Sequence, residues 1–228
     1  MSNKEQPKRK QFTCAELIIT VVIIGVLVIF VVPAIENRRK GFWKQRHCEI
    51  SMKQLYTALH CYHDEYQSFP PAFTVDAEGK PLHSWRVLVL PYLEAENLYR
   101  QIRMDEPWDS EYNRQFHDQM PNVFHCLEAP LKKGDTNYMA LTGPETYFPG
   151  SECRSLDDSA LDRKTTVLLV ETATSTCWMA PIDGSVETMP RVFCYHSGGG
   201  HIAMADGKIE YVKVDNVLSA KREMQNTE

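Results

Sequence analysis

The chain has 228 residues, of which 43% are hydrophobic and 24% are charged, and its mean hydropathy is -0.38. These averages are typical of a globular protein and exclude an intrinsically disordered chain and a multispan membrane protein. The formal net charge of -5 argues against nucleic acid as a partner, because phosphate binding requires concentrated Lys and Arg.

A basic leader and a long apolar segment begin the chain. Residues 1–11 carry a net positive charge, and residues 17–35 contain no charged residue and are mostly Val, Ile and Leu. As a helix the apolar segment would cover about 28 Å, close to the roughly 30 Å of bilayer hydrocarbon. We predict a membrane-spanning helix here, with a buried core helix as the alternative. No small-residue cleavage site of an ordinary secretory signal follows the segment.

Apolar residues then recur at helical spacing beyond the apolar segment. They lie three or four residues apart, which predicts that one helix runs from about residue 14 to residue 66. The sequence Phe-Pro-Pro at 69–71 would end it. The stripe, whose side chains we predict to be core, consists of Cys48, Met52, Leu55, Leu59, Tyr62 and Tyr66.

The remainder mixes helical and extended patterns. Residues 85–103 predict a second helix, broken at Pro91, and residues 122–126, 137–141 and 165–171 predict strands. Residues 201–214 predict two alternating strands joined by a turn at Asp206-Gly207. The expected fold class is therefore α+β and pilin-like: a long N-terminal helix on a small head with a mainly antiparallel sheet.

The start of the apolar segment resembles the class III signal of type IV prepilins and of type II secretion pseudopilins. Residues 11–16 read Gln-Phe-Thr-Cys-Ala-Glu. The resemblance implies that a prepilin peptidase cuts before Phe12, that a methylase modifies the new amine, and that Glu16 pairs with the amine of a neighbouring subunit during assembly. It also makes Pro33 the residue that kinks the helix. Glu16 is notable on physical grounds as well, because a carboxylate at the edge of an apolar run is costly to desolvate.

One residue departs from that signal. Prepilins normally carry Gly before the cut, and this chain has Gln11. An uncleaved protein that stays anchored by its N-terminal helix is therefore the alternative to a processed one.

A wider set of motifs resembles a large planctomycete family of unknown function whose members have a prepilin-type N-terminus. Its C-terminal signature, His-x9-Asp-Gly, is met by His196 with Asp206 and Gly207. The other matching motifs lie in residues 52–55, 59–64, 68–71, 83–87, 90–94 and 136–138. Together they cover nearly the whole chain.

Two groups of residues are candidate metal sites. His196, His201 and Asp206 surround the glycines 198–200, and a Gly-rich turn lets the backbone approach a ligand. The hairpin turn already explains Asp206, so we expect His196 to tether a loop instead. If a metal bound here, the pseudopilin resemblance would imply calcium held by oxygen ligands.

The second group is His60, His63 and Asp64, which share one helix face. For these residues a structural role at the helix end is favoured. No motif of a serine hydrolase, a P-loop, a zinc protease or a dinucleotide fold is present in the sequence, so we expect no enzyme.

The seven cysteines include no Cys-x-x-Cys pair, which excludes a zinc ribbon and a thioredoxin motif. Cys14 would lie in or beside the membrane. The other six would face an oxidising space if the head is exported. Two alternatives follow for these six: one to three disulfides, or buried free thiols. The sequence does not choose a pairing.

The expected organisation is a leader (1–11), a transmembrane and assembly helix (12–36), its continuation (37–66) and an exported head (67–228). We expect a pseudopilin-like structural subunit in the cytoplasmic membrane, with its N-terminus in the cytoplasm and its head outside. Its partners would be the membrane, the prepilin peptidase and methylase, and other copies or related pseudopilins. The alternative is a permanently anchored module whose head binds an ion, a carbohydrate or an envelope component.

Overall fold

The computed structural model describes residues 14–127, 129–186 and 198–213. The chain divides into two compact units, with the boundary between Trp43 and Lys44. The basic leader, Gln11, Phe12 and His196 lie outside the described residues.

The first unit contains the apolar part of helix α1 (Cys14–Tyr66, 53 residues). The predicted long helix is therefore confirmed. Its segment Cys14–Glu36 is long and apolar enough to cross a membrane, by length and composition. The helix continues through Pro33, although proline has no N–H to donate to the preceding turn.

In the second unit, the remainder of α1 forms part of the hydrophobic core. Four side chains of the predicted stripe are fully buried: Cys48, Met52, Leu55 and Leu59. Tyr62 is half-buried against them, whereas Tyr66 is 56% exposed, so the prediction that Tyr66 is core was wrong. The helix ends at this point, because Gln67 adopts a left-handed conformation (φ 58°) and donates its N–H to the His63 carbonyl.

The segment predicted as one broken helix forms three short helical turns instead. They are α2 (Trp85–Leu88), the 3-10 turn η1 (Leu90–Leu93) and α3 (Glu96–Tyr99). Pro91 does not break a helix, because it lies in the first turn of η1, where a missing N–H is tolerated. The chain turns at Glu94, which adopts a left-handed conformation (φ 57°).

A five-stranded sheet forms the centre of the head. Its strands are β3 (Asp135–Thr142), β4 (Val167–Cys177), β5 (Gly184–Ser185), β6 (Gly199–Met204) and β7 (Ile209–Lys213). The order is β5-β3-β4-β6-β7, and all neighbours are antiparallel except β3 and β5. This confirms the α+β fold class with a mainly antiparallel sheet. Strands β1 (Phe73–Val75) and β2 (Pro81–Ser84) form a separate hairpin that the sequence pattern did not predict.

One predicted strand was wrong. Residues 122–126 begin with the 3-10 turn η3 (Asn122–Phe124), which follows the longer 3-10 segment η2 (Asn113–Gln119). Local bonds close this turn, since the Phe124 and His125 amides donate to the carbonyls of Pro121 and Asn122. Alternation of apolar residues over so short a segment does not distinguish a strand from a buried turn.

The predicted C-terminal hairpin is confirmed by strands β6 and β7. Its loop is Ala205-Asp206-Gly207, with Gly207 at φ 92° and its N–H donated to the Met204 carbonyl. This is the three-residue hairpin loop in which the left-handed position demands glycine. Val214, the last residue of the predicted strand, lies outside the described residues.

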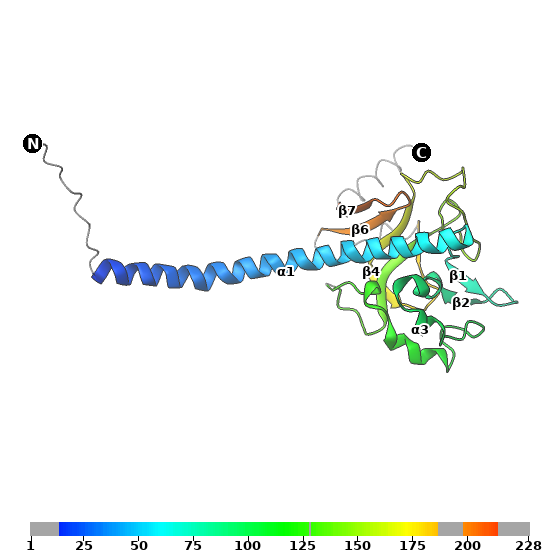
Figure 1. Ribbon diagram of the computed structural model, residues 1–228, viewed down its shortest axis with the longest axis horizontal. Helices are drawn as coiled ribbons and strands as arrows, with labels where there is room; N and C mark the ends of the chain where they lie inside the picture. Colours follow the sequence, from blue (N-terminus) through cyan, green and yellow to red (C-terminus); the bar gives the residue numbers. More distant parts are fainter. Residues whose placement is uncertain (1–13, 128, 187–197, 214–228) are drawn as a thin grey trace, which may run out of the picture. The chain divides into compact units, whose positions relative to one another are not determined.

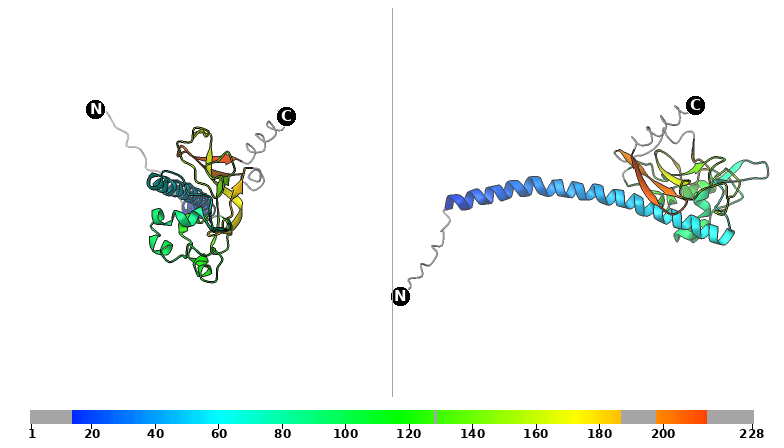
Figure 2. Two further views of the ribbon diagram at one scale, coloured as in Figure 1. Left: turned by 90° about the vertical axis from the view of Figure 1, so that its right-hand side faces the viewer. Right: turned by 90° about the horizontal axis from the view of Figure 1, so that it is seen from above.

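The last turns of α1 pack on the rest of the head through one face and expose the other face. Figures 1 and 2 show β6 and β7 on one side of this part of the helix and the segment containing α3 on the other. One continuous core joins the helix, the inner face of the sheet and the short helices, with Trp85, Trp178 and Phe69 among its largest buried side chains.

Candidate functional site

The surface of the N-terminal helix is apolar on every side. Leu17, Ile24 and Phe30 are 61%, 54% and 71% exposed, and the other large side chains of the segment resemble them. Glu16 lies in the first turn of α1, where a negative charge suits the helix dipole. Thr20 donates its hydroxyl to the Glu16 carbonyl at 2.7 Å. Pro33 lies within the helix, and the cleavage position between Gln11 and Phe12 lies outside the described residues.

The C-terminal candidates are placed on two different elements. His201 lies in β6, is 3% exposed, and donates Nδ1–H to Oε2 of the buried Glu171 at 3.1 Å. Its backbone N–H donates to the same oxygen at 3.2 Å. Asp206 lies in the exposed β6–β7 loop and accepts the Lys208 N–H at 3.0 Å. The structure therefore pairs His201 with Glu171, while His196 lies outside the described residues.

Gly207 of the signature packs directly on α1. A Cβ at this position would lie 3.0 Å from the ring of Tyr56, in addition to its positive φ. The Asp-Gly turn thus fixes the end of the hairpin against the helix.

The histidines at the end of α1 have structural partners. His63 accepts the Leu156 N–H at Nε2 (3.1 Å), which ties the helix to the loop before β4. The ring of His60 lies against Tyr56 and Phe69, and burial lowers its pKa. The Asp64 carbonyl accepts a hydrogen bond from the Gln67 side chain. These contacts support the structural role over the metal-ligand alternative.

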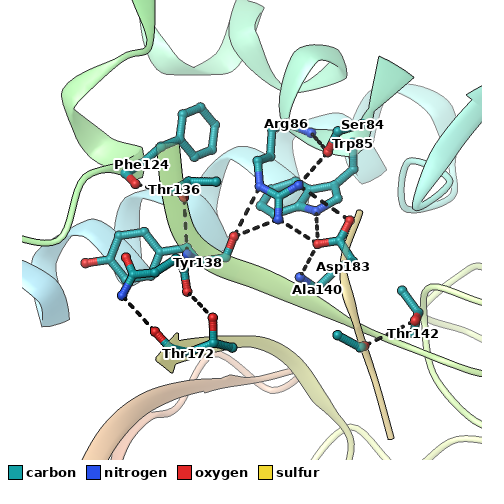
Figure 3. A network of polar contacts seen from close by, with 12 residues as sticks. Ser84, Trp85, Arg86, Phe124, Thr136, Tyr138, Ala140, Thr142, Thr172 and Asp183 are labelled. Atoms are coloured by element: carbon teal, nitrogen blue, oxygen red, sulfur yellow. Dashed lines mark hydrogen bonds and ion pairs between the residues drawn. The ribbon is translucent and has the colours of Figure 1, made fainter. Parts of the chain in front are cut away.

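A buried ion pair that the sequence did not reveal lies between α2 and the sheet (Figure 3). Arg86 is 0% exposed and donates to the Tyr138 carbonyl from Nε (3.1 Å) and Nη2 (2.8 Å), and to Ser84 Oγ from Nη1 (2.7 Å). Its Nη2 also donates to Asp183 Oδ1 at 2.7 Å. Arg86 therefore joins α2, β3 and the segment before β5.

Asp183 also accepts hydrogen bonds from two other residues. Its Oδ1 accepts the indole N–H of Trp85 at 3.2 Å and the backbone N–H of Ala140 at 2.8 Å. Burial raises the pKa of this carboxyl, and the Arg86 guanidinium and the two other donors oppose the rise. The only sequence signal was an Arg within an apolar segment, since a buried Arg requires an acidic partner.

Cysteine and glutamate side chains gather beside this network. Cys48 from α1 and Cys126 after η3 are both 0% exposed, and their Sγ atoms are 3.3 Å apart. Glu171 from β4 completes a group in which the candidate ligand atoms all lie within 4.8 Å of one another. Sequence spacing could not find this group, because its members come from three distant segments.

A groove of about 560 Å³ opens at the β5 edge of the sheet. Its lining includes Phe73, Gly143, Pro144, Ile182 and Val186. Asp183 also lies there, but Arg86 and the other donors already engage its carboxylate.

The comparisons with known proteins support one family. A family model labelled SBP_bac_10 and described as "Protein of unknown function (DUF1559)" matches residues 45–175, more than half of the chain. No curated protein and no solved structure matched. The matched residues include Cys48, Arg86, Cys126 and Glu171, which are all fully buried in the head. The chain therefore belongs to the DUF1559 family of proteins of unknown function.

Proposed function

We propose that the protein is a pilin-like structural subunit that inserts in the cytoplasmic membrane through the first part of α1 and presents its head outside. In this proposal a prepilin peptidase and a methylase process the N-terminus before Phe12. The subunit then assembles with other copies, or with related pseudopilins, into a type II secretion-type pseudopilus or an envelope fibre. The role requires no catalysis and no nucleic acid. A planctomycete source, which the sequence resemblance implies, stays a prediction.

The observation that carries the proposal is the exposed apolar surface of residues 17–35 on a helix that continues into the head's core. Such a surface is unstable in water, since monomeric soluble proteins rarely expose large contiguous apolar patches. Lipid tails and the identical helices of a filament core would cover it equally well. A helix that can exchange one environment for the other is what an assembling pilin requires.

Glu16 supplies the specificity that apolar packing lacks. It is the acidic residue of the first helical turn, at the edge of the apolar surface. Pairing with a neighbour's N-terminal amine would offset the desolvation of both charges and fix the axial register between subunits.

The Glu16→Ala variant tests the assembly role. We expect membranes from cells that make it to contain the protein at the normal level, while its high-molecular-weight assemblies, measured by sedimentation after mild detergent extraction, fall at least tenfold. Glu36→Ala is the matched control, because Glu36 is an exposed carboxylate at the other end of the same apolar segment. Equal sedimentation of the wild type and both variants would refute assembly through Glu16.

Gln11 favours a second candidate, a permanently anchored module whose head binds an ion, a carbohydrate or an envelope component. The intact mass of the membrane-bound protein separates the two. A chain that begins at a methylated Phe12 supports the processed subunit, whereas a chain that begins at Met1 supports the permanent anchor.

A further inference from the structure

Two buried thiols from distant parts of the chain meet in the core of the head. Cys48 lies on the core face of α1, and Cys126 follows η3, separated from it by 78 residues in sequence. Their Sγ atoms are 3.3 Å apart, and neither side chain has any exposed surface.

The surroundings keep the reduced pair protonated. The hydrogen bond to Cys126, burial, and the charge of Glu171 all raise the pKa of Cys48. Burial and Glu171 also raise the pKa of Tyr138, which lies in β3 next to this group. The thiolate is the reactive form, so the folded, reduced pair should react slowly, and oxidation should occur while the chain folds.

A metal ion is the competing explanation for such a cluster. The described residues supply three candidate ligands, Cys48, Cys126 and Glu171, one fewer than the four of a structural zinc site. Oε2 of Glu171 already accepts two hydrogen bonds from His201. A disulfide, in contrast, requires only the two sulfurs that already touch.

We propose that Cys48 and Cys126 form a disulfide bond that fastens the head's part of α1, near its start, to the segment after η3. An external disulfide, such as oxidised glutathione or a thiol–disulfide oxidoreductase, is the oxidant. One thiolate attacks it to give a mixed disulfide, and the second thiolate then displaces the carrier sulfur. The oxidant's S–S bond breaks as the mixed disulfide forms, and the mixed disulfide's S–S bond breaks as the Sγ–Sγ bond forms. The two protons and two electrons end on the oxidant's two thiols.

Formation of the bond in cells rests on the proposed function, because only an exported head meets an oxidising compartment. In an assembled fibre the bond would transmit axial load from the helix to the segment after η3, so that the load would not be carried by core packing alone.

The test uses the full-length protein in detergent, refolded in a mixture of reduced and oxidised glutathione. We expect peptide mass mapping under denaturing, thiol-blocked conditions to recover the Cys48 peptide joined to the Cys126 peptide. Reducing the bond should lower the thermal midpoint by about 10 °C, as expected for a loop of this length in a domain of this size.

Matched cysteine variants separate the bond from simple packing. In Cys48→Ala/Cys126→Ala the thermal midpoint should be insensitive to reductant, whatever its absolute value. In Cys61→Ser/Cys153→Ser, which removes two exposed thiols, the shift with reductant should persist.

Three results would overturn the proposal. The first is alkylation of both Cys48 and Cys126 in the oxidised, unfolded protein, and the second is a dominant bond from either residue to Cys177 or Cys194. The third is stoichiometric zinc released on unfolding with both thiols free, which would assign a metal site instead.

The same peptide mapping on protein taken from thiol-blocked cells then tests separately whether the head lies in an oxidising compartment. A bond in the refolded and the cellular protein supports both proposals. A bond in the refolded protein with free thiols in the cellular one would support the cysteine pair and overturn the exported placement of the head.

Discussion

Arg86 and Asp183 show how one buried charge pair organises three segments of the head. Four of the five hydrogen bonds of the guanidinium and the two further donors to Asp183 connect α2, β3 and the chain before β5. The fifth hydrogen bond goes to Ser84, the last residue of β2. Complete satisfaction of this kind is what makes a buried ion pair tolerable, because each charge has lost its hydration. We expect the pair to specify how these segments meet more than it adds net stability.

Removal of one partner should therefore be costly. We expect Asp183→Ala to lower the free energy of unfolding by about 3–5 kcal/mol, because Arg86 then keeps a buried charge without its counter-ion. Urea unfolding followed by tryptophan fluorescence measures the effect. Asp118→Ala, which breaks an exposed pair with Lys133, is the control and should leave the urea midpoint near that of the wild type.

The double variant Arg86→Met/Asp183→Ala sharpens the test. It should recover part of the loss, since it removes the orphaned charge. If the double variant is less stable than Asp183→Ala, then the loss in Asp183→Ala does not come from the unpaired buried charge of Arg86.

At the scale of elements, the turn before β3 depends on a close backbone approach. Gly134 has φ 82°, and a Cβ there would lie 2.3 Å from the carbonyl oxygen of His117 in η2. The Gly134 carbonyl accepts the Trp178 N–H, and the Trp178 indole donates to the His117 carbonyl. Glycine at this position lets the long 3-10 segment pack on the start of the sheet.

Gly79 provides a matched comparison for Gly134. Its φ is 81°, but a Cβ there would meet nothing within 4 Å. Gly79→Ala should cost about 1 kcal/mol from the backbone conformation alone, whereas Gly134→Ala should cost at least twice that, because the backbone must also move. Urea unfolding of the two variants measures the difference. Equal losses would show that η2 can shift freely and that the close approach does not matter.

At the scale of the whole molecule, the buried core residues that the structure describes all belong to the second unit. The buried core residues begin at Cys48, and the boundary between the two units lies between Trp43 and Lys44. The same helix thus contributes an apolar surface before this boundary and core side chains after it.

Removal of residues 1–43 should therefore give a protein that stays soluble without detergent. We expect its thermal midpoint to lie within a few degrees of that of the full-length chain in mild detergent, measured by circular dichroism. Removal of residues 1–60 is the control and should prevent folding, because it deletes Cys48, Met52, Leu55 and Leu59 from the core. Aggregation of the shorter truncation would contradict an independent head.

The sequence by itself determined the long helix, the apolar segment, the C-terminal hairpin and the α+β class. Each follows from local periodicity or turn chemistry, and the family of unknown function was indicated by ordered motifs. Periodicity gave the wrong element where segments are short, at residues 122–126 and around Pro91. Over so few residues, a 3-10 turn with its own local hydrogen bonds can bury the same apolar residues as a strand or a longer helix.

Only the tertiary structure decided which polar residues meet. Arg86 with Asp183, His201 with Glu171, and Cys48 with Cys126 each join residues from distant parts of the chain. No spacing rule relates such partners, since chain topology brings them together. The energy that selects them is the cost of leaving a buried charge or hydrogen-bonding group without its partner, and that cost exists only once the core has closed around it.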